Sequence, residues 1–167
     1  MVFAYCLFCR TQRCARIAQL LEIKGLKRAF SPRLLQKQRK KGENQRKYVD
    51  MMPGYVFAFT EEQLTDYSIF FGIDGVIRKV GQADDWYELK GMDLVFAQDL
   101  LDKEGKVDGV RVVKTGDEVV LDDSLFSNRQ ARVIDIDYKK GRVKVVFSFR
   151  ENVYPVWVAI DEVVERG

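Results

Sequence analysis

The chain of 167 residues contains no histidine, and this absence excludes several kinds of chemistry. Ser-His-Asp and Cys-His catalysis, histidine metal ligands and imidazole proton relays all require that side chain. Neighbouring carboxylates include the pairs Asp84–Asp85 and Asp122–Asp123, and Asp135 with Asp137. None of them comes with a partner base or a glycine-rich phosphate loop, so solvated turns and strand ends explain them. We therefore expect a protein that is not an enzyme, and a hydrolase or transferase remains only as a minor alternative.

Cysteine is also scarce, and Cys6, Cys9 and Cys14 all fall in one short stretch. An odd, closely spaced set is typical of reduced intracellular thiols and not of a disulfide framework. Cys6 and Cys9 have the spacing of zinc ligands, but a structural site needs four ligands and the chain offers neither a fourth cysteine nor a histidine. We expect small buried side chains, Cys6 above all, and no metal or other cofactor.

Long apolar runs are missing as well. The apolar opening, residues 2–9, lacks a preceding basic segment and ends at Arg10, so it is too short for a signal peptide or a membrane span. With 47% apolar and 32% charged residues, the composition predicts a soluble globular protein of one domain or two small ones. We expect a cytoplasmic monomer with no membrane partner.

The net charge of +3 hides a strong asymmetry along the chain. Residues 1–50 carry 13 Lys and Arg against 3 Asp and Glu, whereas residues 51–167 carry 15 against 22. Such a division indicates that the amino-terminal third faces a polyanion. The alternative is a solvated basic surface without a partner.

Hydrophobic patterning divides the chain into an α+β part and an all-β part. Residues 2–9 predict a buried strand, and Cys14, Ile17, Ala18 and Leu21 recur at helical spacing before a stop at Gly25. Further elements are a basic segment at 33–47, interpreted as a protruding hairpin or a flexible loop, strands at 55–59 and 76–80, a helix from Thr60 and a helix at 94–101. This order predicts a βαββαβ sandwich over residues 1–101, with helices on one face of an antiparallel sheet.

The remainder of the chain differs in its predicted secondary structure, which consists of a linker and short strands. Residues 102–109 hold two glycines and five charges, so we place a linker at 102–113. Short strands follow at 118–121, 130–136, 142–149 and 153–160, and the third alternates apolar with polar residues. Residues 114–167 therefore predict a small barrel domain.

Several motifs carry a resemblance to a known family. Residues 52–57, Met-Pro-Gly-Tyr-Val-Phe, and residues 75–81, Gly-Val-Ile-Arg-Lys-Val-Gly, resemble the amino-terminal domain of NusG transcription elongation and antitermination factors. Residues 115–119 and 141–145 resemble the KOW module, a five-stranded SH3-like barrel. The order and spacing of these motifs extend the resemblance over nearly the whole chain. Arg10, Arg13 and Arg16 are more similar to the specialised RfaH-like or LoaP-like paralogues than to the general factor.

The resemblance implies contacts with RNA polymerase and with nucleic acid. An aromatic strand face and its surroundings would dock on the clamp helices of the polymerase, with the contacts at Tyr5, Tyr55, Phe57 and Arg78. The start of the first helix would face the non-template DNA strand, through Arg10, Arg13 and Arg16. The hairpin would reach upstream duplex or nascent RNA without reading sequence, through Lys37, Arg39, Lys40, Lys41, Arg46 and Lys47. Packing under a helix is the alternative for Tyr55 and Phe57 and is the expected role of Phe59.

The barrel departs from the family in one loop, residues 124–131, where glycines are replaced. The family uses the loop at Phe126 to contact a small-subunit ribosomal protein or the termination factor Rho. Here Arg129 and Arg132 favour RNA as a further option, with solvated loop charges as the alternative. The candidate partner-binding residues are Phe126, Asn128, Arg129 and Arg132.

These features predict a factor that bridges the polymerase clamp and the non-template strand to promote processive elongation, while the barrel recruits a second partner. The alternative is an RNA-binding protein that acts independently of polymerase. Residues 54–59 approximate the aromatic signature of an RNA recognition motif, although Pro53 and Val56 depart from it.

Overall fold

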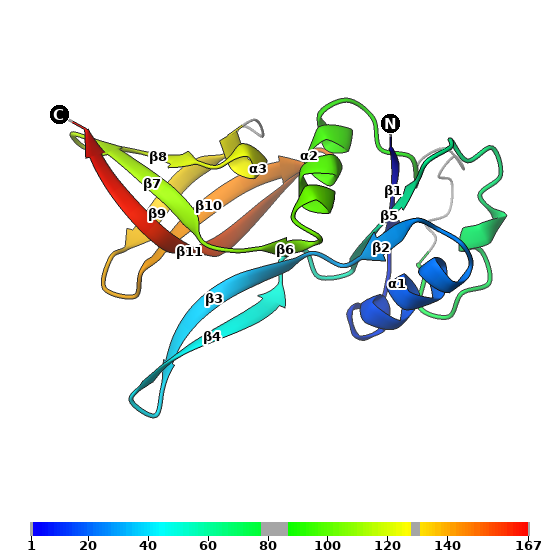
Figure 1. Ribbon diagram of the computed structural model, residues 1–167, viewed down its shortest axis with the longest axis horizontal. Helices are drawn as coiled ribbons and strands as arrows, with labels where there is room; N and C mark the ends of the chain where they lie inside the picture. Colours follow the sequence, from blue (N-terminus) through cyan, green and yellow to red (C-terminus); the bar gives the residue numbers. More distant parts are fainter. Residues whose placement is uncertain (1, 78–86, 128–130, 167) are drawn as a thin grey trace. The chain divides into compact units, whose positions relative to one another are not determined.

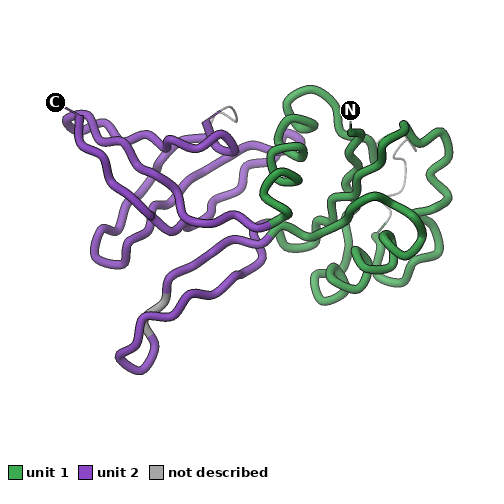
Figure 2. The backbone as a smooth tube through the Cα atoms, viewed as in Figure 1, with its two compact units in different colours: residues 1–32, 52–105 green, residues 33–51, 106–167 purple. Residues whose placement is uncertain are grey.

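The computed structural model describes residues 2–77, 87–127 and 131–166, except for the side chains of residues 38 and 39 (Figure 1). It divides into two compact units (Figure 2). Unit 1 comprises Met1–Pro32 and Met52–Gly105, and unit 2 comprises Arg33–Met51 and Lys106–Gly167. In the described part of the chain, no helix is both long and apolar enough to cross a membrane.

Unit 1 is built on a three-stranded antiparallel sheet whose central strand is β5 (Tyr55–Thr60). β1 (Phe3–Phe8) and β2 (Arg28–Phe30) pair with its two edges. Single bridges extend the sheet, from Tyr5 of β1 to Glu88 and from Cys9, just after β1, to Val76. The strands are apolar because both faces of this sheet are buried.

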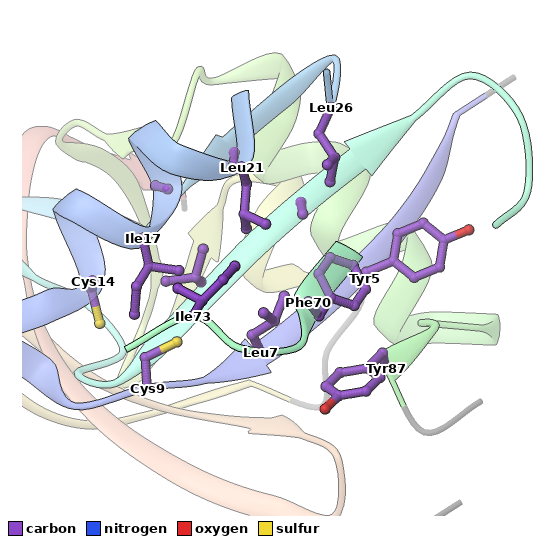
Figure 3. Close-up of a cluster of buried hydrophobic side chains, with 14 residues drawn as sticks. Tyr5, Leu7, Cys9, Cys14, Ile17, Leu21, Leu26, Phe70, Ile73 and Tyr87 are labelled. Atoms are coloured by element: carbon purple, nitrogen blue, oxygen red, sulfur yellow. The ribbon is translucent and has the colours of Figure 1, made fainter. Parts of the chain in front are cut away.

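Helix α1 (Cys14–Ile23) covers one face of the sheet and follows a short 3₁₀ turn, η1 (Thr11–Arg13). The predicted apolar stripe of this helix is buried, as expected. The helix ends as predicted, because Gly25 takes a left-handed φ of 111° and Leu26 N donates to Leu21 O at 3.1 Å. Figure 3 shows the resulting core, a cluster that contains the α1 side chains Ile17 and Leu21 together with Leu7 and Phe70.

Helix α2 (Gly91–Asp102) covers the opposite face of the sheet. Its Phe96 ring lies 6.3 Å from the ring of Phe57, and Phe57 points away from its neighbour Val56, which belongs to the core beneath α1. The sequence correctly predicts this helix within one turn. The expectation that the helices share one face is wrong. Aromatic side chains on the second face of β5 are also removed from water, and α2 is the helix that packs over Phe57.

The helix predicted from Thr60 does not form. Thr60 is the last residue of β5 and pairs with Phe3 in the ladder, so it cannot cap a helix. Its hydroxyl donates instead to Glu62 O at 2.6 Å, and the next regular element is the 3₁₀ turn η2 (Ser68–Phe70). Of the strand predicted at 76–80, Val76 forms a bridge, and residues 78–80 lie outside the described residues.

Unit 2 contains a five-stranded, half-barrel sheet, which is consistent with the predicted KOW-like barrel. The strand order is β8 (Glu118–Asp122), β7 (Val110–Thr115), β11 (Asn152–Arg166), β10 (Arg142–Phe149) and β9 (Arg132–Asp137). The long β11 pairs antiparallel with β10 and parallel with β7, and the edge strands β8 and β9 approach each other. The predicted inward residues of β10, Val143, Val145, Phe147 and Phe149, are fully buried.

The basic segment forms the predicted hairpin, from β3 (Arg33–Lys40) and β4 (Glu43–Asp50). Lys41 and Gly42 turn it with φ angles of 54° and 79°. β3 also pairs with β6 (Lys106–Val107), which groups the hairpin with the carboxy-terminal segment. The units thus differ from the predicted segments, and the predicted linker holds β6 and the start of β7. The domain bounds 1–101 and 114–167 stay a prediction.

Candidate partner and nucleic-acid interfaces

Two of the predicted polymerase-binding residues, Tyr5 and Phe57, are fully buried in unit 1. The Tyr5 ring lies 5.9 Å from that of Phe70, and its hydroxyl accepts a hydrogen bond of 2.7 Å from Leu64 N (Figure 3). Phe57 packs beneath Phe96 of α2. Both side chains are core, which corrects the prediction, because the sheet is covered on both faces and leaves them no surface for a partner. Burial of Phe59 is as expected.

Tyr55 is different, because it lies at the end of β5 and is only half-buried. Phe8, also half-buried, is its partner across the ladder, and the two rings are 5.4 Å apart. Ile77 lies beside them, with 39% exposure and its backbone N donating to Phe8 O at 2.8 Å. We call Phe8, Tyr55 and Ile77 the aromatic corner. Sequence reasoning missed Phe8, although the antiparallel register opposite Tyr55 is a signal that could have found it.

Gly54 shapes the aromatic corner. It takes a left-handed φ of 91°, and a Cβ at this position would lie 2.9 Å from Phe8 Cε2 and 3.0 Å from Cys9 O. Cys9 N donates to Gly54 O at 2.6 Å, which ties the turn to the end of β1. The proline-glycine turn before β5 therefore fixes the approach of Tyr55 to Phe8.

The three arginines near the start of α1 have different environments. Arg10 and Arg16 are exposed, and Arg16 donates to Gln19 Oε1 at 3.1 Å. Arg13 is half-buried and pairs with Asp74 at 3.4 Å. The Arg13 stem also fills the space beside Gly75, where a Cβ would come within 2.8 Å of it. Arg13 therefore holds the loop at 73–76, and Arg10 and Arg16 present the cationic surface.

The described cations of the hairpin are mostly on its surface. Lys40, Lys41, Arg46 and Lys47 are exposed, and Lys37 is half-buried. Arg39 lies on β3, but its side chain is outside the described residues. Arg78, Asn128 and Arg129 lie outside them altogether.

One face of the hairpin contacts the rest of unit 2. Lys37 donates to Ile160 O at 2.7 Å, and Asp161 forms ion pairs with both Lys37 and Arg46. Nearer the base, the Tyr48 hydroxyl donates to Asp108, and this hydrogen bond raises the pKa of Tyr48 above its ordinary value. These contacts bring segments that are remote in sequence onto one side of the hairpin.

The predicted partner loop of the barrel is only partly available. Phe126, in α3 (Ser124–Ser127), is 1% exposed, and its ring packs at 5.9 Å against Phe147. Phe126 therefore belongs to the barrel core, which corrects the prediction that it contacts a partner. Arg132, on edge strand β9, is exposed.

The three cysteines are buried thiols, which confirms the expected burial of Cys6. Burial raises the pKa of the Cys9 thiol to about 12, with a smaller contribution from Cys14. Cys14 Sγ donates to Arg10 O at 3.6 Å, so it also serves to hold the entry to α1. Within the described ranges, no three Cys, Asp or Glu side chains are placed to hold a metal ion.

The fold and these surfaces define a two-unit α+β protein that presents an aromatic corner and separate cationic surfaces. The family model described as transcription termination factor nusG matches residues 5–94, more than half of the chain. The protein therefore belongs to the NusG family, and it is a transcription factor of the elongation and termination type.

A solved structure supports the same architecture. The chain is similar to NusG of Thermotoga maritima, from a study titled "Domain interaction in Thermotoga maritima NusG". The two share 16% sequence identity with a TM-score of 0.55, over 96% of this chain and 94% of that one. No curated protein sequence matches the chain.

Proposed function

We propose that this protein is an elongation and antitermination factor that binds the clamp helices of RNA polymerase through its aromatic corner. The observation that supports this best is the pair Phe8 and Tyr55, which stays half-exposed on a sheet face whose other aromatic residues, Phe30, Phe57 and Phe59, are buried. Two rings held together offer a large, rigid apolar surface at low entropic cost. Membership of the NusG family makes RNA polymerase the main partner.

Arg10 and Arg16 bind the non-template DNA strand in this proposal. Exposed guanidinium groups pair with phosphate or stack on unpaired bases. Arg13 contributes by positioning, since its pair with Asp74 holds the neighbouring loop. The hairpin adds backbone contacts to upstream duplex or nascent RNA. The arginine-rich entry to α1 supports a specialised RfaH-like or LoaP-like role.

The barrel of unit 2 recruits a second partner. Burial of Phe126 removes the aromatic contact by which this module would bind a small-subunit ribosomal protein or Rho. Exposed Arg132 favours nascent RNA instead. The alternative of a polymerase-independent RNA recognition motif has no support, because such a sheet stacks bases on an open face and here α2 covers that face.

The test is binding of the purified protein to core RNA polymerase. Tyr55→Ala should abolish association and leave the circular dichroism spectrum unchanged. Tyr138→Ala is the matched control, because it removes a 51% exposed tyrosine from unit 2. Equal binding by both variants would overturn the docking proposal.

A further inference from the structure

One carboxylate in unit 2 lies between two cations of the hairpin. Asp161 Oδ1 is 3.7 Å from Lys37 Nζ and 3.8 Å from Arg46 Nη2. We propose that Lys37 and Arg46 form a phosphodiester-binding site, which Asp161 fills in this structure as an internal anion that nucleic acid displaces. This inference rests on the proposed nucleic-acid contact of the hairpin and adds how that contact is regulated.

The two cations are arranged as a pair by the sheet itself. Lys37 and Arg46 are direct partners in the β3–β4 register, so their side chains leave the same face of the hairpin. An ammonium and a guanidinium that converge on one anionic oxygen suit a non-bridging phosphate oxygen as well as a carboxylate. Two positive charges against one negative also leave this site with an excess of positive charge.

The ion pairs of Asp161 with Lys37 and Arg46 are weak enough for another anion to replace the carboxylate. The side chains of Arg46 and Asp161 are 66% and 48% exposed, so water and salt screen their attraction. Lys37 is the more constrained cation, because it also donates to Ile160 O at 2.7 Å. A phosphodiester can therefore replace Asp161 without uncovering a buried charge.

The carboxylate of Asp161 lies against the backbone of Gly109, in the space that a side chain at residue 109 would fill. A Cβ on residue 109 would lie 2.2 Å from Asp161 Oδ1 and 2.3 Å from its Cγ. Gly109 is not among the glycines with positive φ, so its backbone conformation is open to alanine. The absence of a side chain at Gly109 therefore lets the Asp161 carboxylate lie against the backbone. A substitution at this glycine moves the anion without changing any charge.

Displacement of Asp161 frees the cationic face but leaves the base of the hairpin attached. The pairing of β3 with β6 and the hydrogen bond from Tyr48 to Asp108 lie nearer the base and do not involve Asp161. The exposed Lys40, Lys41 and Lys47 provide the first attraction for a polyanion. Binding then proceeds by exchange of one anion for another at Lys37 and Arg46.

The test measures binding of the full chain to two labelled probes, a single-stranded RNA and a duplex DNA, by fluorescence anisotropy over a range of salt concentrations. Asp161→Asn should tighten binding by about 3-fold to 10-fold, since loss of weak surface pairs shifts affinity on that scale. It should also steepen the plot of log K against log salt by about 1, because the freed cations now release counterions. The probe with the larger change identifies the physiological strand type.

Two further variants separate the internal anion from general charge effects. Glu162→Gln changes the net charge equally, but Glu162 pairs with Arg111 and not with the hairpin, so less than about a 2-fold effect is expected. Gly109→Ala keeps the charge and should reproduce the tighter binding of Asp161→Asn. Equal behaviour of Asp161→Asn and Glu162→Gln would overturn the inference, even if Gly109→Ala fails to fold.

The double variant Lys37→Gln with Arg46→Gln distinguishes this inference from the proposed function. It should weaken binding about 10-fold and remove the effect of Asp161→Asn. Unchanged affinity in the double variant would overturn the nucleic-acid contact at these two residues. Weakened affinity, together with no tightening in Asp161→Asn, would overturn the internal anion alone.

Discussion

Tyr55 lies directly opposite Phe8 in the β1–β5 ladder, with 5.4 Å between the ring centroids. The contact joins two aromatic residues of this sheet face that helix α2 leaves half-exposed. A partner that binds here meets two rings already fixed in position, so little side-chain entropy is lost on docking. The corner therefore depends on the backbone that brings the rings together, and that backbone can be tested separately from the rings.

Gly54→Ala should disturb the corner without removing either ring. The new Cβ would meet Phe8 Cε2 at 2.9 Å and would sit at a φ of 91°. We expect a loss of about 1–3 kcal/mol in the free energy of unfolding, measured with urea, and weaker polymerase binding. Gly42→Ala is the matched control, because Gly42 has a φ of 79° but nothing within 4 Å of its Cβ position. Equal losses would show that crowding of Phe8 is unimportant.

Phe57→Ala should act on stability and not on recognition. The ring is fully buried between Phe30 and Phe96, so its removal leaves a cavity. We expect the free energy of unfolding to fall by about 3–5 kcal/mol, measured by chemical denaturation. Tyr55→Ala, at a half-exposed site, should cost about 1 kcal/mol. A small loss at Phe57 would contradict the covered sheet face.

The Tyr48–Asp108 hydrogen bond predicts a pH dependence. It raises the pKa of Tyr48 above 10.0, so the folded protein favours the neutral phenol. The stabilisation is therefore present below the ordinary tyrosine pKa and is lost as the pH rises through the raised value. Asp108→Asn should move the Tyr48 titration back toward its ordinary range. The ultraviolet absorbance of tyrosinate measures this, with Tyr48→Phe to identify the signal.

Cys9 should resist thiol reagents in the native protein. Burial raises its pKa to about 12, so almost no thiolate exists near neutral pH. Cys6 and Cys14 are buried as well. We expect a chromogenic disulfide reagent to detect no thiol in the folded chain at pH 8 and all three in denaturant. Rapid labelling of Cys9 before unfolding would contradict the buried site.

Local patterns in the sequence predict an element correctly where the hydrophobic periodicity has no competing long-range contact. The alternation in residues 142–149 matches β10, and the stripe from Cys14 to Leu21 is the buried face of α1. Thr60 shows how such a signal is overridden. Its sequence fits a capping box, but the ladder with Phe3 already uses its backbone, and strand pairing prevails.

The candidate site was harder to predict because its contacts are remote in sequence. Alternation placed Phe57 and Tyr55 on one face correctly, but whether a face is covered depends on α2, which follows about 35 residues later. Lys37 and Ile160 are 123 residues apart, and no local pattern reports such a pair. The count of charged residues along the chain locates the basic hairpin. It cannot show that Asp161, far away in sequence, pairs with the hairpin cations Lys37 and Arg46.

The hairpin also determines how the chain connects the two units. Residues 33–51 belong to unit 2, while the segments on both sides belong to unit 1, and the chain enters unit 2 again at Lys106. The polypeptide therefore crosses between the units three times. A protease that cuts between Gly105 and Lys106 breaks the covalent link to residues 106–167, which then stay attached only through the pairing of β3 with β6 and the other contacts of the hairpin. A chain that ended at Gly105 would keep the hairpin but lose both β6 and Asp161, and its cations would meet solvent unopposed.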